Sequence, residues 1–298
     1  MEKVPVLYIT GTGHSGTTLL CQIIGTTQTS FSVGEVKFLE SFLKEDLGDL
    51  PNIPEDFSFT CDCSRKISSC PFWSKVLKKK EGPTFPRHLS TFEKLRLILG
   101  YQTQSSSEYT DRELYHAMLN AAREIKNENV CRIIDASKDV TRLSYLLTLN
   151  SLQVGILHIV RDGRAVVNSH QKRGYHWLKS WFDWFTSNVL ISMKKHTSNT
   201  VCLTVSYEEF TMNPEKHLEE INNVFDISID LETYIQDVEE EEYHQFAGNL
   251  GTRDGIGEIY YDDSWKEELS TWKQWILTIL CFIPNQIWVY NSDSEPEG

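Results

Sequence analysis

The chain lacks a long hydrophobic run, an excess of basic residues and an internal repeat. Its only late apolar run, Trp275 to Val289, is too short to span a bilayer and contains Pro284, so it predicts a packed helix. Acidic residues outnumber basic ones by 42 to 29 among 298 residues, giving a net charge of −13. This balance argues against broad nucleic-acid binding, because no basic stripe is present to displace phosphate counterions. The amino terminus has no basic stretch or signal-type apolar core, so we expect a cytoplasmic protein.

The seven cysteines do not form an obvious metal-binding pattern. Cys61, Cys63 and Cys70 offer three thiolates, one fewer than a closed structural zinc site requires, and no histidine stands at a suggestive spacing. We therefore expect no metal and assign these cysteines a packing role. A disulfide between Cys70 and either neighbour is the alternative in an oxidising compartment.

A glycine-rich turn near the amino terminus lacks the lysine of nucleoside triphosphatases. Val4 to Thr10 predicts a buried strand, and Gly11-Thr-Gly-His-Ser-Gly-Thr-Thr18 leads from it into a helix. Such a turn binds phosphate, because glycines let backbone N–H groups approach the anion at the positive end of the helix dipole. The triphosphatase pattern is GxxxxGK[ST], and here Thr17 occupies the lysine position. The turn therefore predicts phosphate binding without lysine-and-magnesium triphosphate chemistry.

A second anion-binding element follows another predicted strand, Gln153 to Val160. It begins at Arg161, and Asp162 is placed to cap the next helix. Ser169 and Arg173 share one face of that helix because they are four residues apart. An arginine fork with a hydroxyl suits a phosphate monoester, so we expect Arg161 and Ser169 to meet over one anion.

Two phosphate-binding elements without a triphosphatase lysine suggest a nucleotide phosphorylated at two places. The sequence here resembles the PAPS-dependent sulfotransferase superfamily, and its motifs are most similar to those of bacterial, carbohydrate-type and tyrosylprotein sulfotransferases. The resemblance implies that Ser15-Gly-Thr-Thr18 binds the 5′ end of PAPS (3′-phosphoadenosine 5′-phosphosulfate) and that Arg161 and Ser169 bind its 3′-phosphate. The turn residues expected to contact the nucleotide are Gly13, His14, Ser15, Gly16, Thr17 and Thr18.

Shorter matches extend the resemblance over most of the chain. They are Asp135-Ala-Ser-Lys138, Val205-Ser-Tyr-Glu-Glu-Phe210, the cysteine segment Cys61 to Trp73, and a nucleotide-covering loop comprising His244 to Asn249 with Arg253, Asp262 and Trp265. The resemblance favours nucleotide contact by Tyr207. Arg173 and Arg253 are further candidates near the 3′-phosphate, and an ordinary surface ion pair is the alternative for each.

Three residues are candidates for catalysis. Ser32-Val-Gly-Glu35 resembles the element that supplies the catalytic glutamate of tyrosylprotein sulfotransferases, which makes Glu35 the candidate general base. The resemblance favours Lys138 for neutralising the leaving phosphate. His14 replaces the cation that precedes SGTT in many relatives, and it acts either as a protonated cation or as a neutral hydrogen-bond donor. His244 is a second candidate base, ranked below Glu35.

Strands alternating with helices predict an α/β fold of three layers, with a parallel central sheet covered on both faces, as in P-loop proteins. The predicted strands are Val4 to Thr10, Phe31 to Gly34, Val130 to Asp135, Val154 to Val160 and Thr200 to Val205. The predicted helices are Ser15 to Ile24, Asp111 to Lys126, Val140 to Asn150, Asp162 to Lys172, Leu178 to Lys195 and Glu215 to Phe225. We expect one domain over residues 1–291, a largely helical acceptor-side insertion at about 37–129, and a disordered tail over 292–298. The residues Gly11, Glu35, Lys138, Arg161 and Tyr207 all follow strand ends and are expected to meet in one cleft.

The resemblance implies transfer of a sulfuryl group from PAPS to a hydroxyl, or less readily an amine, giving 3′,5′-ADP (EC 2.8.2 class) without a metal. The acceptor is a carbohydrate, a peptide tyrosine or a small metabolite, and the sequence leaves both this choice and the oligomeric state open. The first alternative is an ATP-dependent nucleotide or small-molecule kinase, which the missing lysine disfavours. The second is a nucleotide-binding module that has lost catalysis.

Overall fold

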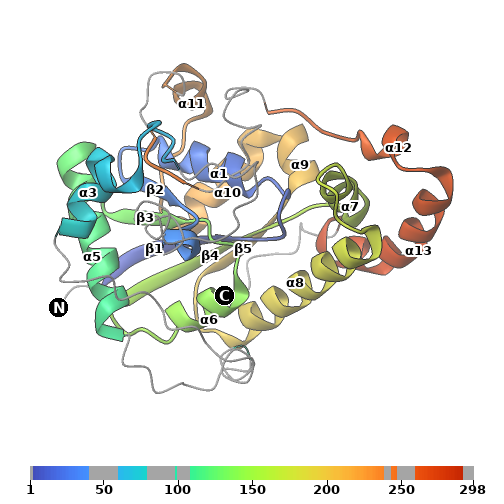
Figure 1. Ribbon diagram of the computed structural model, residues 1–298, viewed down its shortest axis with the longest axis horizontal. Helices are drawn as coiled ribbons and strands as arrows, with labels where there is room; N and C mark the ends of the chain where they lie inside the picture. The colour runs from blue at the N-terminus through green and yellow to red at the C-terminus, as the bar shows by residue number, and fades with distance from the viewer. Residues whose placement is uncertain are drawn as a thin grey trace.

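The computed structural model describes residues 3–39, 60–78, 98, 108–237, 243–246 and 259–290. Five strands form one parallel sheet in the order β2-β3-β1-β4-β5 (Figure 1). They are β1 (Val4–Thr10), β2 (Ser30–Gly34), β3 (Arg132–Asp135), β4 (Leu152–Val160) and β5 (Cys202–Ser206). Because all five strands point the same way, their carboxyl ends meet at one edge of the sheet.

Helices cover both faces of this sheet, which confirms the expected α/β fold. On one side lie α1, α9 and α10, and on the other α5, α6 and α8 (Figure 1). The helices are α1 (Thr17–Gly25), α3 (Pro71–Lys78), α5 (Glu108–Ile125), α6 (Val140–Leu146), α7 (Gly163–Gln171), α8 (Trp177–Thr197), α9 (Tyr207–Met212), α10 (Pro214–Phe225), α11 (Leu231–Asp237), α12 (Trp265–Glu268) and α13 (Thr271–Trp288), with 3-10 turns η1 (Val36–Phe38) and η2 (Ile67–Ser69).

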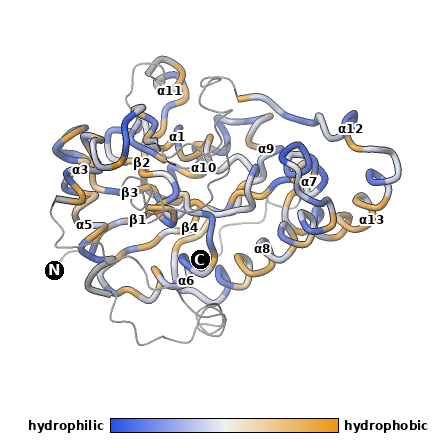
Figure 2. Tube along the Cα trace, viewed as in Figure 1, coloured by the Kyte–Doolittle hydropathy of each residue, from blue (hydrophilic) through white to orange (hydrophobic). Residues whose placement is uncertain are grey.

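The central strand β1 contributes to both layers of the core. Its residues Val6 and Tyr8 pack on the side of α3, α5 and α6, whereas Leu7 and Ile9 pack on the side of α1 and α10. This alternation follows from the two-residue repeat of a strand, and all four side chains are buried. Figure 2 shows the apolar strands concentrated in the middle of the molecule. A strand buried on both faces consists of consecutive apolar residues, so the position of β1 can be predicted from the sequence.

The five predicted strands and six predicted helices are confirmed, with small differences at their ends. α6 ends at Leu146 instead of Asn150, because the backbone tightens there into a turn in which the Leu149 N–H bonds the Leu146 carbonyl. The short helix α9 has no counterpart in the sequence predictions. It begins directly at the end of β5, where the Ser206 hydroxyl accepts the backbone N–H of Glu209.

The described part of the stretch assigned to the insertion, residues 37–129, contains helices and an isolated bridge between Thr60 and Lys66. α5 packs against β1 and β3, and Tyr115 on this helix donates a hydrogen bond of 2.5 Å to Asp135 at the end of β3. The carboxyl-terminal part of the stretch is therefore the crossover helix between β2 and β3, and it belongs to the layers around the sheet.

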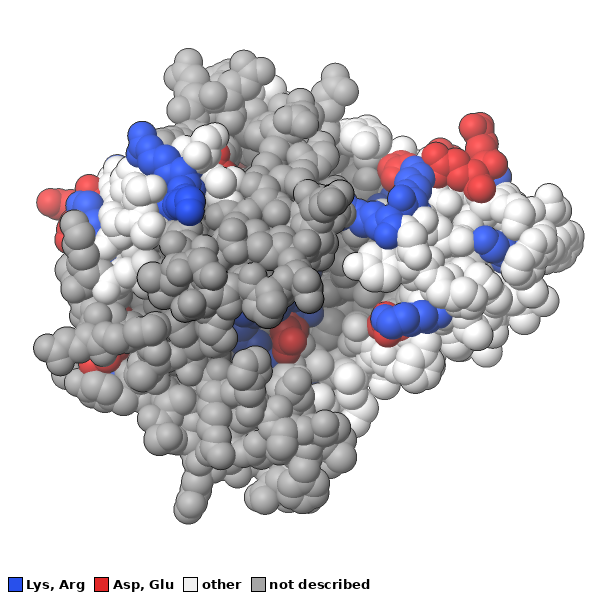
Figure 3. Space-filling view, viewed as in Figure 1, with Lys and Arg blue, Asp and Glu red and all other residues white. Residues whose placement is uncertain are grey.

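The late apolar run forms α13, but packing covers only part of it. Leu277 and Cys281 are buried, whereas Trp275 is 70% exposed and Ile279 74% exposed. The expectation of a packed helix is thus wrong for the outer face of α13. Figure 3 shows that the end of the molecule formed by this helix carries few charged groups on the face in view. No helix among the described residues is long and apolar enough to cross a membrane.

Candidate active site

The turn between β1 and α1 has the geometry of an anion cradle. The buried Ser15 hydroxyl donates to the Thr12 carbonyl at 2.7 Å and holds the turn closed. Gly16 has φ +91°, and a Cβ built there would lie 2.7 Å from Cδ2 of Tyr207, so only glycine fits without strain. Gly16 is also the N-cap of α1, and no side chain caps the helix at that residue. The positive end of the helix therefore faces the turn.

Arg161, directly after β4, connects this cradle with the carboxyl-terminal part of the chain. Its Nη1 donates to the His14 carbonyl at 2.9 Å, and its Nη2 contacts the Asp262 carboxylate at 2.9 Å. The guanidinium carbon lies 4.3 Å from the centre of the Tyr207 ring. The Arg161 side chain is 8% exposed, and its buried Nε has no hydrogen-bond partner among the described residues. Arg161 therefore fixes the position of the turn while presenting charge at its edge.

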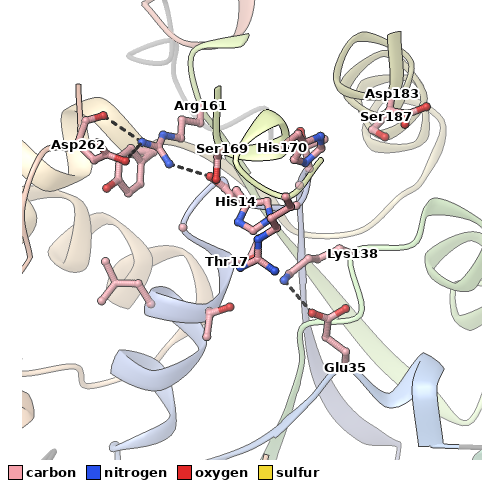
Figure 4. Close-up of a pocket in the computed structure, with 18 of the residues that line it drawn as sticks. His14, Thr17, Glu35, Lys138, Arg161, Ser169, His170, Asp183, Ser187 and Asp262 are labelled. Carbon is pink, nitrogen blue, oxygen red and sulfur yellow. Dashed lines mark hydrogen bonds and ion pairs between the residues drawn. The ribbon is translucent and has the colours of Figure 1, made fainter. Parts of the chain in front are cut away.

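Glu35 and Lys138 meet on the other side of the turn. Lys138 Nζ lies 2.8 Å from Glu35 Oε1, and Lys37 Nζ lies 3.3 Å from Oε2 of the same carboxylate. Figure 4 shows the contact of Glu35 with Lys138 facing His14 and Thr17 across the pocket. A carboxylate and an ammonium group therefore stand together at the ends of β2 and β3.

A buried network holds the backbone that carries Lys138. Asp135 is completely buried and accepts hydrogen bonds from the Ser137 N–H, from the Ser137 hydroxyl and from Tyr115. Arg142 Nε lies 3.2 Å from the same carboxylate and compensates its charge. Lys138 itself has φ +57°, an uncommon conformation for a residue with a side chain. The network thus stabilises a strained position, which is a frequent feature of functional sites.

Burial and nearby cations keep His14 neutral. Burial, followed by the charges of Arg173, His170, Lys138 and Arg161, lowers the pKa of His14 to about 3. Of the two roles open from the sequence, this structure favours the neutral hydrogen-bond donor over the protonated cation.

These groups open into one cavity of about 670 Å³. Residues that follow all five strands line it, namely Gly11, Glu35, Lys138, Arg161 and Tyr207. The predicted convergence at the carboxyl ends of the strands is therefore present. The cavity is large enough for a small-molecule ligand and has both cationic and anionic groups in its wall.

Comparison with known proteins identifies the fold. No protein-family model and no curated protein sequence match the chain. The sulfotransferase domain from the Synechococcus PCC 7002 olefin synthase superposes with a TM-score of 0.52 at 15% identity, over 96% of each chain. The sulfotransferase domain from the curacin biosynthetic pathway gives a TM-score of 0.53 at 12% identity, over 94% of this chain and 98% of that chain. The chain has the sulfotransferase fold.

Within this sulfotransferase fold, most of the predicted nucleotide-contacting residues line the cavity. They are Gly13, His14, Gly16, Thr17, Thr18, Arg161, Ser169, Arg173 and Tyr207. Ser15 is buried beneath the turn and supports it from inside. Arg253 and the other residues of the predicted covering loop between 247 and 258 lie outside the described residues.

The structure does not support His244 as an alternative base. Its side chain is buried, it is absent from the lining of the described cavity, and its Nδ1 lies 3.4 Å from Cys70 Sγ. The prediction that Cys61, Cys63 and Cys70 lack a fourth metal-binding partner is also wrong. Folding brings His244 to them, although it lies 174 positions after Cys70 in the chain.

Several side chains that line the cavity were not predicted from the sequence to be site residues. The main ones are Lys37, His170, Asp183, Ser187 and Tyr260. Lys37 stands two residues after Glu35, so its nearness to the candidate base was readable from the sequence. Asp183 and Ser187 are four residues apart on α8, which predicts a shared face but not the cavity that this face meets.

Proposed function

We propose that this chain is a PAPS-dependent sulfotransferase that transfers the sulfuryl group to a hydroxyl, or less readily an amine, of its acceptor and releases 3′,5′-ADP. The observation that carries the proposal is the shared cavity. The glycine-rich turn and Arg161 with Ser169 are the two phosphate-binding elements expected from the sequence, and both open into the space that Glu35 and Lys138 also face.

In the proposed reaction, the acceptor oxygen attacks sulfur while the bond from sulfur to the bridging phosphate oxygen breaks. Glu35 takes the proton from the acceptor hydroxyl, a contribution typically worth about 10²–10⁴ in rate. Negative charge grows on the bridging oxygen, where Lys138 and the positive end of α1 stabilise it. The contact of Lys138 with Glu35 keeps the groups for proton removal and for charge neutralisation side by side.

The environment of Arg161 gives the nucleotide proposal a specific consequence. The Asp262 carboxylate contacts Arg161 Nη2 in this structure, so a 3′-phosphate would compete with it for the guanidinium. Ser169 lines the same cavity and offers a hydroxyl to that phosphate. The exchange of one anionic partner for another lets Arg161 stay paired both with and without nucleotide.

Isothermal titration with three nucleotides tests the proposal without knowledge of the acceptor. We expect 3′,5′-ADP to bind more tightly than 5′-AMP, its matched control lacking the 3′-phosphate, and more tightly than ATP with Mg²⁺. Preferential binding of ATP with Mg²⁺ would instead indicate a kinase. Transfer of radiolabelled sulfate from PAPS to a library of carbohydrates, tyrosine peptides and small metabolites then tests catalysis. Nucleotide binding without any transfer would point to a binding module.

A further inference from the structure

Three cysteines and a histidine form a cluster away from the proposed active site. The side-chain donor atoms of Cys61, Cys63, Cys70 and His244 all lie within 4.8 Å of one another. Cys70 Sγ is 3.6 Å from Cys61 Sγ and 3.4 Å from His244 Nδ1. None of the four lines the large described cavity.

The two Cys70 separations match the edges of a tetrahedral zinc site. Zinc–sulfur bonds of about 2.3 Å and zinc–nitrogen bonds of about 2.0–2.1 Å, meeting at the tetrahedral angle, place two sulfurs about 3.8 Å apart and sulfur and nitrogen about 3.5 Å apart. The two measured contacts agree with both values within the usual tolerance for a metal site. Three thiolates and one imidazole are a closed ligand set of the structural type, and soft sulfur donors in a tetrahedron favour zinc over magnesium or calcium.

Local structure arranges the donors in advance. The Cys61 N–H donates to the Arg65 carbonyl at 2.8 Å, and the Ser64 N–H donates to the Cys61 carbonyl at 2.8 Å. These bonds fold residues 61–65, which include the first two cysteines, into a tight turn. Ser64 takes φ +61° at the bend. Cys70 directly precedes α3, so the start of that helix fixes its position. The cysteine segment is therefore shaped as a chelating loop independently of His244.

His244 is held in place from the other direction. Trp73 Nε1 on α3 donates to the His244 carbonyl at 2.8 Å, and the Asp62 N–H donates to the Gln245 carbonyl at 2.8 Å. The next residue, Phe246, accepts the backbone N–H of Glu35 at 3.2 Å. Segment 243–246 thus lies between the cysteine segment and the residue proposed as the general base.

We propose that Cys61, Cys63, Cys70 and His244 bind one structural zinc ion that fastens segment 243–246 to segment 60–78. The site leaves no ligand position for substrate, since four protein donors complete the tetrahedron. It supports the backbone next to Glu35 and takes no part in sulfuryl transfer. The inference stands on this ligand set alone and does not depend on the proposed activity.

Zinc content of the purified full-length chain tests the site directly. Protein prepared under reducing conditions without chelators should contain about one zinc per chain by plasma mass spectrometry, and Cys63→Ser and His244→Gln should each lower this about tenfold or more. Cys131→Ser is the matched control, because Cys131 is an exposed cysteine outside the cluster. This variant should keep the full zinc content.

Two further measurements separate loss of metal from loss of fold. Replacement by Co²⁺ should give the thiolate-to-cobalt charge-transfer absorption of a tetrahedral sulfur site in the wild type and in Cys131→Ser. A strong chelator should lower Tm of these two proteins and leave Tm of Cys63→Ser unchanged. Wild-type protein that neither contains zinc nor takes up added Zn²⁺ or Co²⁺ would overturn the proposal. So would a disulfide between Cys61 and Cys70 in protein purified under reducing conditions, or zinc retained in both cluster variants.

Discussion

Two histidines, His158 in the core and the partly buried His14 in the cavity wall, should make the protein lose stability in mild acid. The pKa values of His14 and His158 are both lowered to about 3, in each case first by burial and then by nearby cations. His158 is completely enclosed and its Nε2 lies 3.0 Å from Asn188 Oδ1. In the unfolded chain an imidazole titrates near ~6.5. Below that pH the unfolded chain takes up a proton that the folded chain does not, so stability present above pH ~6.5 is lost as pH falls toward 3.

The magnitude follows from the two pKa values of each histidine. Between pH 7.5 and pH 5.0, an imidazole with a pKa of ~6.5 unfolded and ~3 folded costs about 2 kcal/mol of unfolding free energy. His14 and His158 together therefore account for a loss of about 4 kcal/mol, against a typical total stability of about 5–15 kcal/mol.

Urea denaturation at both pH values measures this loss in the wild type, His14→Gln and His158→Gln. Each variant should show a pH-dependent loss smaller than that of the wild type by about 2 kcal/mol, whatever its stability at pH 7.5. Comparing this pH-dependent loss between the wild type and each variant cancels the contribution of the other titrating groups. His176→Gln, at an exposed position, is the matched control. An equal loss in the wild type and in His14→Gln would refute the assignment of a neutral His14.

Five other substitutions probe the proposed site. Arg161→Lys should weaken binding of 3′,5′-ADP by about 10- to 150-fold in titration, which corresponds to one charged hydrogen bond of about 1.5–3 kcal/mol. Asp262→Asn removes the competing carboxylate and should not weaken this binding. Lys138→Met and Glu35→Gln should each reduce transfer by about 10²-fold or more with little change in nucleotide affinity, and their combined effect on rate should be smaller than the product of the two. Equal losses of rate and affinity would contradict these roles. Gly16→Ala should lower the free energy of unfolding by about 1–3 kcal/mol and abolish nucleotide binding. A variant with wild-type stability and wild-type nucleotide affinity would argue against the cradle.

The strands and the cradle could be predicted because their signals are local. β1 is an apolar run bounded by glycine, and the same short stretch contains all the glycines that the turn needs. The predicted meeting of the candidate residues in one cavity is also confirmed, because parallel strands end at one edge whatever their order in the sheet. The order itself came only from the structure, since neighbouring strands such as β1 and β4 are separated by most of the first half of the chain.

The contacts that escaped prediction join residues far apart in the sequence. Arg161 and Asp262 are 101 positions apart, and Cys70 and His244 are 174 apart, so no spacing rule connects either pair. The pKa of His14 likewise depends on charged groups that follow β3 and β4 and that lie at or after the end of α7, which meet only after folding. A motif therefore indicates which chemistry is present, while long-range packing decides which charges face it.

The hydrogen bond from the Glu35 N–H to the Phe246 carbonyl has a consequence for biosynthesis. Glu35 leaves the ribosome 211 residues before Phe246, the residue that anchors its backbone. A nascent chain can assemble β1 and the phosphate turn well before this contact exists, and closing such a distant pair is a slow step in folding. Ribosome-stalled chains that end before Phe246 should thus form the glycine-rich turn between β1 and α1 ahead of a fully positioned Glu35.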